Sequence, residues 1–416
     1  MSYTLGQTLY KLDSKGKVRE WKIEVVDNGT FASIVTTAGL QDGKQVVNTV
    51  DVYEGKNIGK ANETTYYTQA VSEALATAEL KLRGEYRTSL ENVEHQTLRS
   101  GIKAPMLAQK YSKDGSQSGS KTLEKMKLQG QKIHVQPKLD GNRCLIKVAP
   151  TADLSDCEVT FYTRKGDVMP VQLPHIADEV AKAYGSVFFA DGFSPDTPEM
   201  VLDGELFSNE MSFNELNGHL KRKDSADATQ LEKIKYHLYD VMLDKPYNER
   251  YERLKYLLEA FSSDYNKQME HIHLIPSYEI DASDETINDF LVKFLEEGHE
   301  GLMIRRLDTP YENKRSWQLC KVKTFEDAEY ELVDIEEDAR GGIVGAFVMK
   351  LPVPSTNRDG KMIMTFNAGV SGLTQQEGAK MLANKEAYIG KQATVEYFGL
   401  SEYGIPRFPK LKAFRD

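Results

Sequence analysis

The sequence predicts an α+β protein of several domains: a small N-terminal module of β-sheet and helix, a mixed α/β middle and a C-terminal β-barrel. Three observations carry this prediction. The chain has 416 residues, which is too many for one compact core. Strand and helix patterns alternate through the middle of the chain, and strand patterns with Gly-rich turns return after about residue 325.

The N-terminal module is expected to span residues 1–98. Apolar and charged residues alternate from Trp21 to Val25, and Asn28-Gly29 separates this run from a second apolar run at 31–36, which is a strong hairpin signal. A further strand is expected at 46–52. From Glu63 onward the apolar residues recur every three or four positions, which predicts one helix behind a short sheet.

The middle of the chain alternates between the two kinds of pattern. A Gly/Ser-rich stretch at 112–120 is expected to be a loop. Strands are expected at 133–136, 145–149, 158–163, 201–207 and 236–242, and helices at 176–183, 249–262 and 286–297. In the strand-rich C-terminal part a short helix is expected at 375–383.

Composition narrows the class of protein. No long uncharged apolar run predicts a membrane span, and the polar N-terminus does not resemble a secretory signal. The three cysteines form no CxxC pair, so we expect neither a zinc site nor disulfides, and a reducing cytoplasmic setting. The net charge is −10, yet residues 340–416 hold eleven Lys or Arg against six Asp or Glu, which suits contact with an anionic partner.

Charged residues are embedded in several of the predicted strands. Lys138 begins a Lys-Leu-Asp-Gly-Asn-Arg segment, Glu205 lies within an apolar strand, and Glu300 precedes another. Lys321 and Lys323 share one face of a strand, because side chains alternate with period two. Buried charges need partners or a ligand. These groups could neutralise one another, or they could line one pocket in which the acids hold a divalent metal or ribose and the lysines surround a phosphate.

The order of these segments resembles that of a known enzyme superfamily. KxDGxR, DGE, an aromatic-Asp pair, EGLM and KxK resemble the motifs of the covalent nucleotidyltransferases, which comprise ATP-dependent DNA ligases, RNA ligases and mRNA capping enzymes. The resemblance covers about residues 102–416 and includes Pro105-Met106-Leu107-Ala108. It implies an ATP-grasp-like adenylation (nucleotidyltransferase) domain at 99–324, followed by an OB-fold β-barrel at 325–416.

The resemblance also implies roles for individual residues. Lys138 would attack the α-phosphate of ATP and become lysyl-AMP, and Asp140 would orient it. Nucleotide contacts are implied for Gln136 at the adenine edge (where many relatives have Glu), Arg143 and Glu205 at the ribose, Tyr239 stacked on adenine, Lys321 and Lys323 at the α-phosphate, and Arg164 at AMP or the nick phosphate. Arg164 follows Thr163, where the family usually has Ser. Glu205 and Glu300 would bind a metal.

The implied chemistry is three phosphoryl transfers with ATP as the AMP donor and Mg²⁺ or Mn²⁺ as the cofactor. The attacking amine must be uncharged. We expect Lys321, Lys323, Arg143 and the metal to lower the pKa of Lys138 through like-charge repulsion. NAD is not expected as the donor, since no nicotinamide-binding module or cysteine-rich zinc element is seen.

The C-terminal segment favours a DNA ligase. Phe366–Thr374, Ile389–Lys391 and Gly404–Pro409 resemble the OB-fold barrel of DNA ligases, and Arg407 and Arg415 match positions that contact pyrophosphate and DNA. The family's usual Arg-x-Asp-Lys ending is absent from this sequence, which stops at Asp416, so the pyrophosphate-contacting residue stays open.

The sequence thus predicts an ATP-dependent DNA ligase that seals nicked duplex DNA in replication or repair. The alternatives are an RNA ligase, a capping-type nucleotidyltransferase, or a catalytically inactive DNA-binding protein with a ligase core. Size and the N-terminal unit resemble ligases of bacteriophages, which implies the host-cell cytoplasm; a monomer is expected.

The N-terminal module resembles WGR-type DNA-binding modules in part, although Thr36–Gly39 stands where Trp-Gly-Arg would be. Four basic residues on or beside one hairpin suggest that it grips duplex DNA, and a structural or protein-binding role is the alternative: Lys15, Lys17, Arg19 and Lys22.

Overall fold

The structure is a computed structural model. It describes residues 3–13, 15–94, 96–111, 120–151, 156–188, 199–222, 227–323, 326–338, 342–356, 360–370, 373–397, 399–401 and 403–415. The predicted loop at 112–120 therefore lies outside the described residues except for Ser120, which is the first residue of a helix.

The chain divides into two compact units, which are described separately. One comprises Met1–Tyr10, Val18–Leu80 and Thr324–Asp416, and the other Lys11–Lys17 and Lys81–Lys323. The α+β multidomain class expected from the sequence is confirmed: the first unit holds an N-terminal antiparallel sheet and a C-terminal domain built on a five-stranded sheet, and the second holds the mixed α/β domain.

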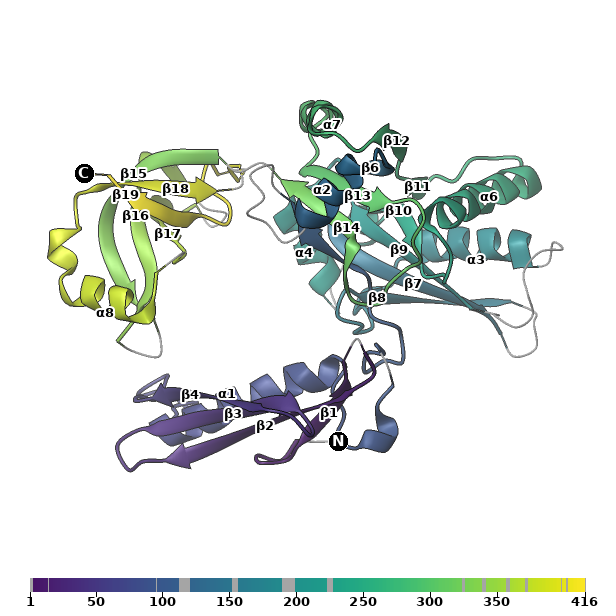
Figure 1. Ribbon diagram of the computed structural model, residues 1–416. Coiled ribbons are helices and arrows are strands. Elements are labelled where there is room, and N and C mark those ends of the chain that lie inside the picture. The colour runs from purple at the N-terminus through teal and green to yellow at the C-terminus, as the bar shows by residue number, and fades with distance from the viewer. Residues whose placement is uncertain are drawn as a thin grey trace. The chain divides into compact units, whose positions relative to one another are not determined.

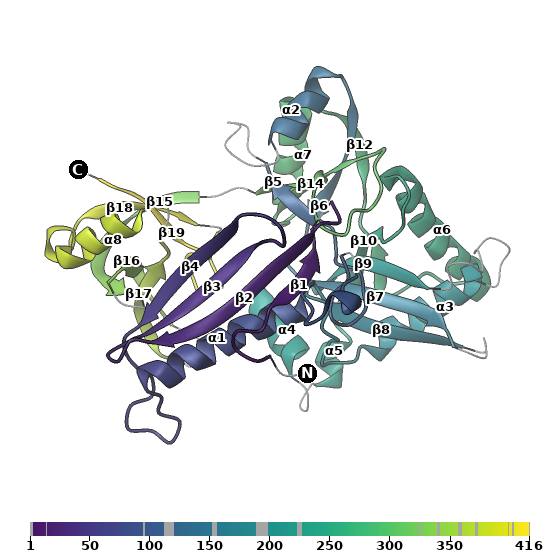
Figure 2. The same ribbon diagram turned by 60° about the horizontal axis from the view of Figure 1, so that its bottom comes forward.

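The N-terminal part is an antiparallel sheet with a helix along it (Figures 1 and 2). The predicted hairpin is confirmed as the pairing of β2 with β3. Trp21 and Ile23 of β2 are buried, and so are Ala70, Ala74 and Ala78, which recur every four residues along one face of the helix. The sheet order is β1-β2-β3-β4, and the elements are β1 (Leu9–Leu12), β2 (Val18–Asp27), β3 (Ala32–Leu40), β4 (Gln45–Val52) and α1 (Tyr66–Arg83).

The C-terminal domain is an antiparallel sheet with an apolar core of its own, in which Phe347 and Met349 are fully buried. The predicted short helix is α8, and Thr374 caps it through a capping box with Glu377. The sheet order is β17-β16-β15-β18-β19, and the elements are β15 (Glu326–Glu337), β16 (Val344–Thr356), β17 (Met362–Ala368), α8 (Gln375–Ala383), η2 (Lys385–Ala387), β18 (Gln392–Tyr397) and β19 (Lys410–Phe414).

The middle domain contains two five-stranded sheets. The first is covered by α3 and α6, which pack against each other (Figure 1). Its largest cluster of apolar side chains joins the inner faces of these helices to the sheet. The sheet order is β11-β10-β9-β7-β8, and the elements are β7 (Asn142–Pro150), β8 (Cys157–Thr163), α3 (Pro174–Phe188), β9 (Met200–Phe207), β10 (Lys235–Val241), α6 (Tyr247–Tyr265) and β11 (Ile272–Leu274).

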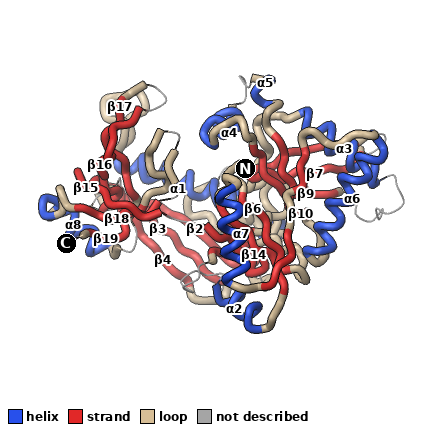
Figure 3. Tube along the Cα trace, turned by 90° about the horizontal axis from the view of Figure 1, so that it is seen from above, coloured by secondary structure: helices blue, strands red, loops and turns tan. Residues whose placement is uncertain are grey.

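The second sheet is covered by α7, which lies beside β6 (Figure 3). The same helix contacts β13. Its order is β12-β6-β13-β14-β5, and the elements are β5 (Leu107–Lys110), α2 (Ser120–Leu128), β6 (Lys132–Lys138), β12 (Tyr278–Asp281), α7 (Asp284–Glu296), β13 (Gly301–Arg306) and β14 (Arg315–Lys323). Three short helices complete this unit: η1 (Leu90–Asn92), α4 (Phe213–Lys221) and α5 (Ala228–Leu231).

The segment from Lys138 to Asn142 crosses between the two sheets. Although β6 and β7 are consecutive, they do not pair, because β6 joins β12 and β13 while β7 joins β8 and β9. The surface hairpin that an Asp-Gly turn usually makes is therefore not formed here. A Cβ at Gly141 would lie 2.8 Å from Cγ of Glu205, so glycine allows this crossing to pass close to β9. The crossing leaves Lys138 at the seam between the sheets.

Among the described residues, no helix has the length and apolarity needed to cross a membrane.

Candidate active site

Lys138 and Lys323 both donate to one carboxylate. Lys138 Nζ contacts Oε2 of Glu300, and Lys323 Nζ contacts its Oε1. Glu300 is buried, and its backbone N–H donates to the carbonyl oxygen of Lys138 at 2.8 Å. Three of the residues predicted from the sequence are thus brought into direct contact from the ends of β6, β13 and β14.

Gly301 lies between Lys138 and Lys323 in the strand register of the second sheet. Its Cα pairs with that of Lys138 on β6 and with that of Lys323 on β14. Gly301 has a φ of 149°, and a Cβ there would collide with the carbonyl oxygen of Val322. A residue without a side chain therefore lies between Lys138 and Lys323 in the strand register, and the carboxylate of Glu300 joins their two ammonium groups.

The pKa of the Lys138 amine is lowered from its ordinary value, first because the side chain is desolvated and then because of repulsion by Arg164. Glu205 and Asp140 act in the opposite direction. The predicted direction is correct, and burial, which the prediction left out, is the largest cause. Arg164 repels this amine, and so does Lys321 as predicted, because the repulsion between Lys321 and Lys138 is mutual. The placement at the seam of two sheets produces this burial.

A second group of cations gathers around Lys321. Burial lowers the pKa of its amine, and four cations lower it further by repulsion: Lys138, Arg164, Lys110 and Arg315. Arg164 lies after β8 and is exposed, yet burial of part of its side chain and the charges of Arg143 and Arg315 lower its pKa as well. Several cations that repel one another on one face form a binding surface for a polyanion.

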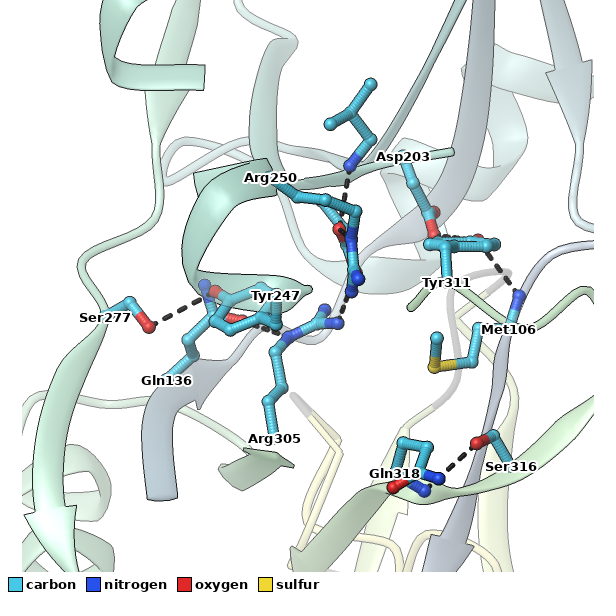
Figure 4. A network of polar contacts seen from close by, with 12 residues as sticks. Met106, Gln136, Asp203, Tyr247, Arg250, Ser277, Arg305, Tyr311, Ser316 and Gln318 are labelled. Atoms are coloured by element: carbon cyan, nitrogen blue, oxygen red, sulfur yellow. Dashed lines mark hydrogen bonds and ion pairs between the residues drawn. The ribbon is translucent and has the colours of Figure 1, made fainter. Parts of the chain in front are cut away.

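Arg143 forms an ion pair with Asp203, a contact that the sequence did not predict. Its Nε donates to Oδ1 of Asp203 at 2.9 Å and its NH2 to Oδ2 at 2.5 Å, a bidentate pair between β7 and β9. Tyr311 donates its hydroxyl to the same Oδ2 at 2.6 Å and accepts the backbone N–H of Met106 at 2.9 Å (Figure 4). Asp203 is only 1% exposed. The guanidinium of Arg143 is thus oriented before any ligand binds.

Glu205 lies beside this pair and opposite Arg143 in the register of β7 and β9. Burial raises the pKa of its carboxyl to about 7, against the opposing charges of Lys138 and Arg143, while Asp203 and Asp140 raise it further. A buried carboxylate in this state gains from an added cation or hydrogen-bond donor.

Gln136 lies two residues before Lys138 on β6, so both side chains share one face of the strand. Gln136 is 1% exposed, and its Oε1 accepts from Nε of Arg305 at 2.7 Å (Figure 4). Arg305 also donates from NH1 to Oδ2 of Asp240 at 2.6 Å. Asp240 in turn receives Nε and NH2 of Arg250 at 2.7 and 3.1 Å. Two arginines, one aspartate and one glutamine form a continuous buried network.

The ring of Tyr239 lies near both Arg143 and Arg305. Its ring centroid is 5.9 Å from the guanidinium carbon of Arg143 and 5.5 Å from that of Arg305. The ring is half-buried, and burial raises the pKa of its hydroxyl well above the ordinary value. An aromatic ring that is half-buried near two guanidinium groups is a side chain on which an aromatic base can stack.

Two predicted residues lie in the C-terminal domain, which belongs to the other compact unit. Arg415 donates to Glu329 at 2.9 Å on β15, and Arg407 lies 5.8 Å from the ring of exposed Phe408. Asp140 lies in the crossing segment after Lys138 and is half-buried.

Five residues of these networks were not predicted from the sequence: Asp203, Asp240, Arg250, Arg305 and Tyr311. Two of them stood inside recognised motifs, Asp203 in Asp-Gly-Glu and Asp240 next to Tyr239. Arg305 is two residues beyond Met303, and hence on the same face of β13, which was an available signal. Tyr311 lies in a loop and gave no signal.

A lysine at the seam of two sheets, in contact with a buried carboxylate and with further lysines and arginines near it, forms a site suited to an enzyme that acts on nucleotide phosphates. The ATP dependent DNA ligase domain model matches residues 105–323, and a DNA ligase OB-like domain model matches residues 340–415. The chain belongs to the ATP-dependent DNA ligase family.

Individual relatives agree with this assignment. A DNA ligase of African swine fever virus is 25% identical over 395 residues, which cover 92% of this chain and 84% of that one. A DNA ligase of Haemophilus influenzae is 31% identical over 222 residues, covering 52% of this chain and 72% of that one. A solved Lig E DNA ligase shares the fold, with a TM-score of 0.52, 19% identity and coverage of 76% of this chain and 100% of that chain. The protein is an ATP-dependent DNA ligase, and RNA ligation and capping lose their support.

Proposed function

We propose that Lys138 is the residue that carries AMP in this ligase. The observation that carries the proposal is the position of its amine: the side chain is half-buried at the seam of two sheets and in contact with Glu300, and its pKa is lowered. A lysine placed only for stability would gain nothing from a lowered pKa, whereas a nucleophile needs the uncharged form.

Three transfers follow. In the first, Nζ of Lys138 loses its proton and attacks the α-phosphorus of ATP, an N–P bond forms, the bond to the β-phosphate oxygen breaks and pyrophosphate leaves. In the second, an oxygen of the 5′-phosphate at a nick attacks the same phosphorus and releases the lysine. In the third, the 3′-hydroxyl attacks the 5′-phosphate and AMP leaves. Each step needs in-line geometry and neutralised charge.

The cation groups around Lys138 supply that neutralisation. Lys323 and Lys321 would contact the α-phosphate, and Arg164 would contact AMP or the nick phosphate. Arg143 and Glu205 would hold the ribose, Tyr239 would stack on the base, and Asp140 would orient Lys138. In support, the pKa values of Lys321 and Arg164 are lowered, first by burial and then by repulsion from neighbouring cations, and an anion would relieve that repulsion.

Glu205 and Glu300 fit a divalent cation. Both are carboxylates, the hard oxygen donors that Mg²⁺ and Mn²⁺ prefer, and the raised pKa of Glu205 marks a group that gains from an added cation. No cluster of three metal-binding side chains occurs among the described residues, and Mg²⁺ in phosphate sites takes one or two carboxylates plus substrate oxygens. When bound, the metal would withdraw charge from the phosphoryl oxygens.

The remaining assignments concern the whole chain. Domain limits of 1–98, 99–324 and 325–416 are proposed, with the N-terminal module gripping duplex DNA and Arg407 and Arg415 contacting pyrophosphate or DNA. A monomer, a bacteriophage source, action in the host-cell cytoplasm, and roles in replication or repair complete the proposal. Light scattering tests the monomer, and a nick-binding assay on a chain lacking residues 1–98 tests the module; unchanged nick affinity would refute it.

Incubation with α-labelled ATP tests the central assignment. The intact protein should gain an acid-labile covalent label and seal a nicked duplex, while Lys138→Ala should gain none. Lys132→Ala is the matched control, because Lys132 lies on the same strand, is exposed and pairs with Glu279 at 3.0 Å. Sealing without label, or label that persists in Lys138→Ala, would show that another residue carries AMP. Absence of both label and sealing would identify the inactive, DNA-binding alternative.

A further inference from the structure

One buried donor in the site has no partner. The Nε2 atom of Gln136 is buried and makes no hydrogen bond within the described part of the chain. An unmade hydrogen bond at a buried amide is costly, so such a group in a binding site calls for a ligand acceptor. The other end of the same amide is occupied, because Oε1 accepts from Arg305.

The contact with Arg305 determines which way the amide points. A guanidinium has donors and no acceptor, so only the oxygen of Gln136 can face it. With the amide flipped, two donors would meet at hydrogen-bond distance. The orientation with Nε2 turned away from Arg305 therefore follows from the chemistry of the pair.

Arg305 is itself unable to turn. Its NH1 is bound to Asp240 at 2.6 Å, and Asp240 is held from the other side by Arg250. Arg250 also donates to the carbonyl oxygens of Lys245 and Thr309 at 2.6 and 2.9 Å. Arg305, Asp240 and Arg250 are 4%, 0% and 2% exposed. A guanidinium fixed at both ends fixes the amide in front of it.

We infer that Arg305 is a positioning residue that, through Gln136, makes this ligase select a 6-aminopurine nucleotide over a 6-oxopurine one. With the amide held, its oxygen accepts from the amino group at position 6 of adenine and its Nε2 donates to the neighbouring ring nitrogen. Guanine has an acceptor at position 6 and a donor at position 1, so both contacts become repulsive. An amide free to flip would accept either base.

The inference rests on the proposed function, because the base must lie at Gln136 when its α-phosphate lies at Lys138. Two observations support that placement. Gln136 and Lys138 share a face of β6, and the guanidinium carbon of Arg305, which holds the Gln136 amide, is 5.5 Å from the centre of the half-buried Tyr239 ring, so that the amide and an aromatic side chain lie near one another.

Arg305→Met is the informative variant. It leaves Arg250 and Asp240 as a one-to-one pair, so no buried acid loses its last partner. The measurement is the rate of lysyl-nucleotide formation with α-labelled ATP and with α-labelled GTP, each resolved into kcat and KM. The ratio of kcat/KM for ATP to that for GTP should fall by about tenfold or more, since a paired base contact discriminates to that extent.

Separate values of kcat and KM distinguish the loss of the positioned base contact from a distortion of the catalytic centre. A base contact acts equally on bound substrate and transition state, so the change should appear in KM for both nucleotides, with kcat retained. Distortion of the catalytic centre would lower kcat for both and leave the ratio intact. Arg305→Lys, which keeps the charge and one donor, should restore part of the discrimination.

Two further variants keep the test decisive. Arg306→Met is the matched control, since Arg306 is the next residue of β13, faces the other side and pairs with Asp308 at 3.4 Å; its ratio should equal that of the natural chain. Gln136→Leu should lose the same discrimination as Arg305→Met, and the double variant should lose no more.

The outcomes are distinguishable. If the ATP-to-GTP ratio of kcat/KM is unchanged in Arg305→Met while Lys138 still becomes labelled, the inference is overturned. Should Arg305→Met fail to fold, an unchanged ratio in Gln136→Leu has the same meaning. Additive losses in the double variant would also overturn it, because the two residues would then act independently. Absence of label on the natural chain with either nucleotide would instead overturn the proposed function.

Discussion

Lys138 and Lys323 approach the two oxygens of one carboxylate, that of Glu300, from strands that flank the same glycine. Their Cα atoms both pair with that of Gly301, one from β6 and one from β14. The site thereby concentrates two cations where a phosphate can lie, and it shares the negative charge of Glu300 between them.

Lys323→Ala should slow both adenylylation and nick sealing, by about 100-fold, as is usual when a charge-stabilising group is removed from a phosphoryl-transfer site. Two causes act together. The phosphate loses a cation, and the carboxylate of Glu300 then contacts Lys138 alone, which stabilises the charged, non-nucleophilic form of the Lys138 amine. Single-turnover rates with ATP and with pre-adenylylated enzyme would measure the two effects. Lys314→Ala, just before β14 and paired with Glu312 at 2.9 Å, should behave as the natural chain.

Asp203→Asn should destabilise the middle domain by about 3 kcal/mol, because Arg143 would keep its charge in a largely buried place without a carboxylate. Urea unfolding would measure it. Tyr311→Phe removes only a hydroxyl from the same network and should cost about 1 kcal/mol. Equal losses for the two variants would mean that the Arg143–Asp203 pair contributes no more than one neutral hydrogen bond.

Adenylylation should depend on pH through Lys138. Since burial and Arg164 lower the pKa of this amine, the rate should rise with pH and reach half its maximum below the ordinary lysine pKa of 10.5. Arg164→Gln removes the repulsion, so the pKa of Lys138 and the half-maximal pH should move upward. Lys165→Gln, an exposed neighbour, should leave the profile in place. A profile that Arg164→Gln does not move would assign the whole shift to burial.

His237 should make the first sheet sensitive to acid. Burial, together with His273 and His299, lowers its pKa to about 4 from 6.5. Above pH 6.5 the group is neutral in both folded and unfolded chains; below it only the unfolded chain binds the proton, so stability falls as the pH falls toward 4. The loss is at most roughly 3 kcal/mol. Urea midpoints between pH 7 and 5 should decline less steeply in His237→Gln, and parallel declines would contradict this assignment.

Much of the fold could be predicted from periodicity alone. The hairpin at Asn28-Gly29, the alternating strands and the helix at 375–383 follow local rules that the tertiary structure respects. The motifs also placed Lys138, Glu300 and Lys323 in one site by resemblance. Local patterns could not show that β6 and β7 enter different sheets, because strand pairing is decided by contacts between distant residues.

By itself, the sequence determined which groups are present and where along the chain they lie: a lysine before an Asp-Gly step, one acid in a strand and another just before a strand, and a pair of lysines two residues apart. Only the tertiary structure decided their partners. It assigned Arg143 to Asp203 and Gln136 to Arg305, and it made burial rather than repulsion the main cause of the lowered pKa of Lys138. Hydrogen-bond partners and desolvation depend on how two sheets meet, and that meeting is a property of the packed domain as a whole.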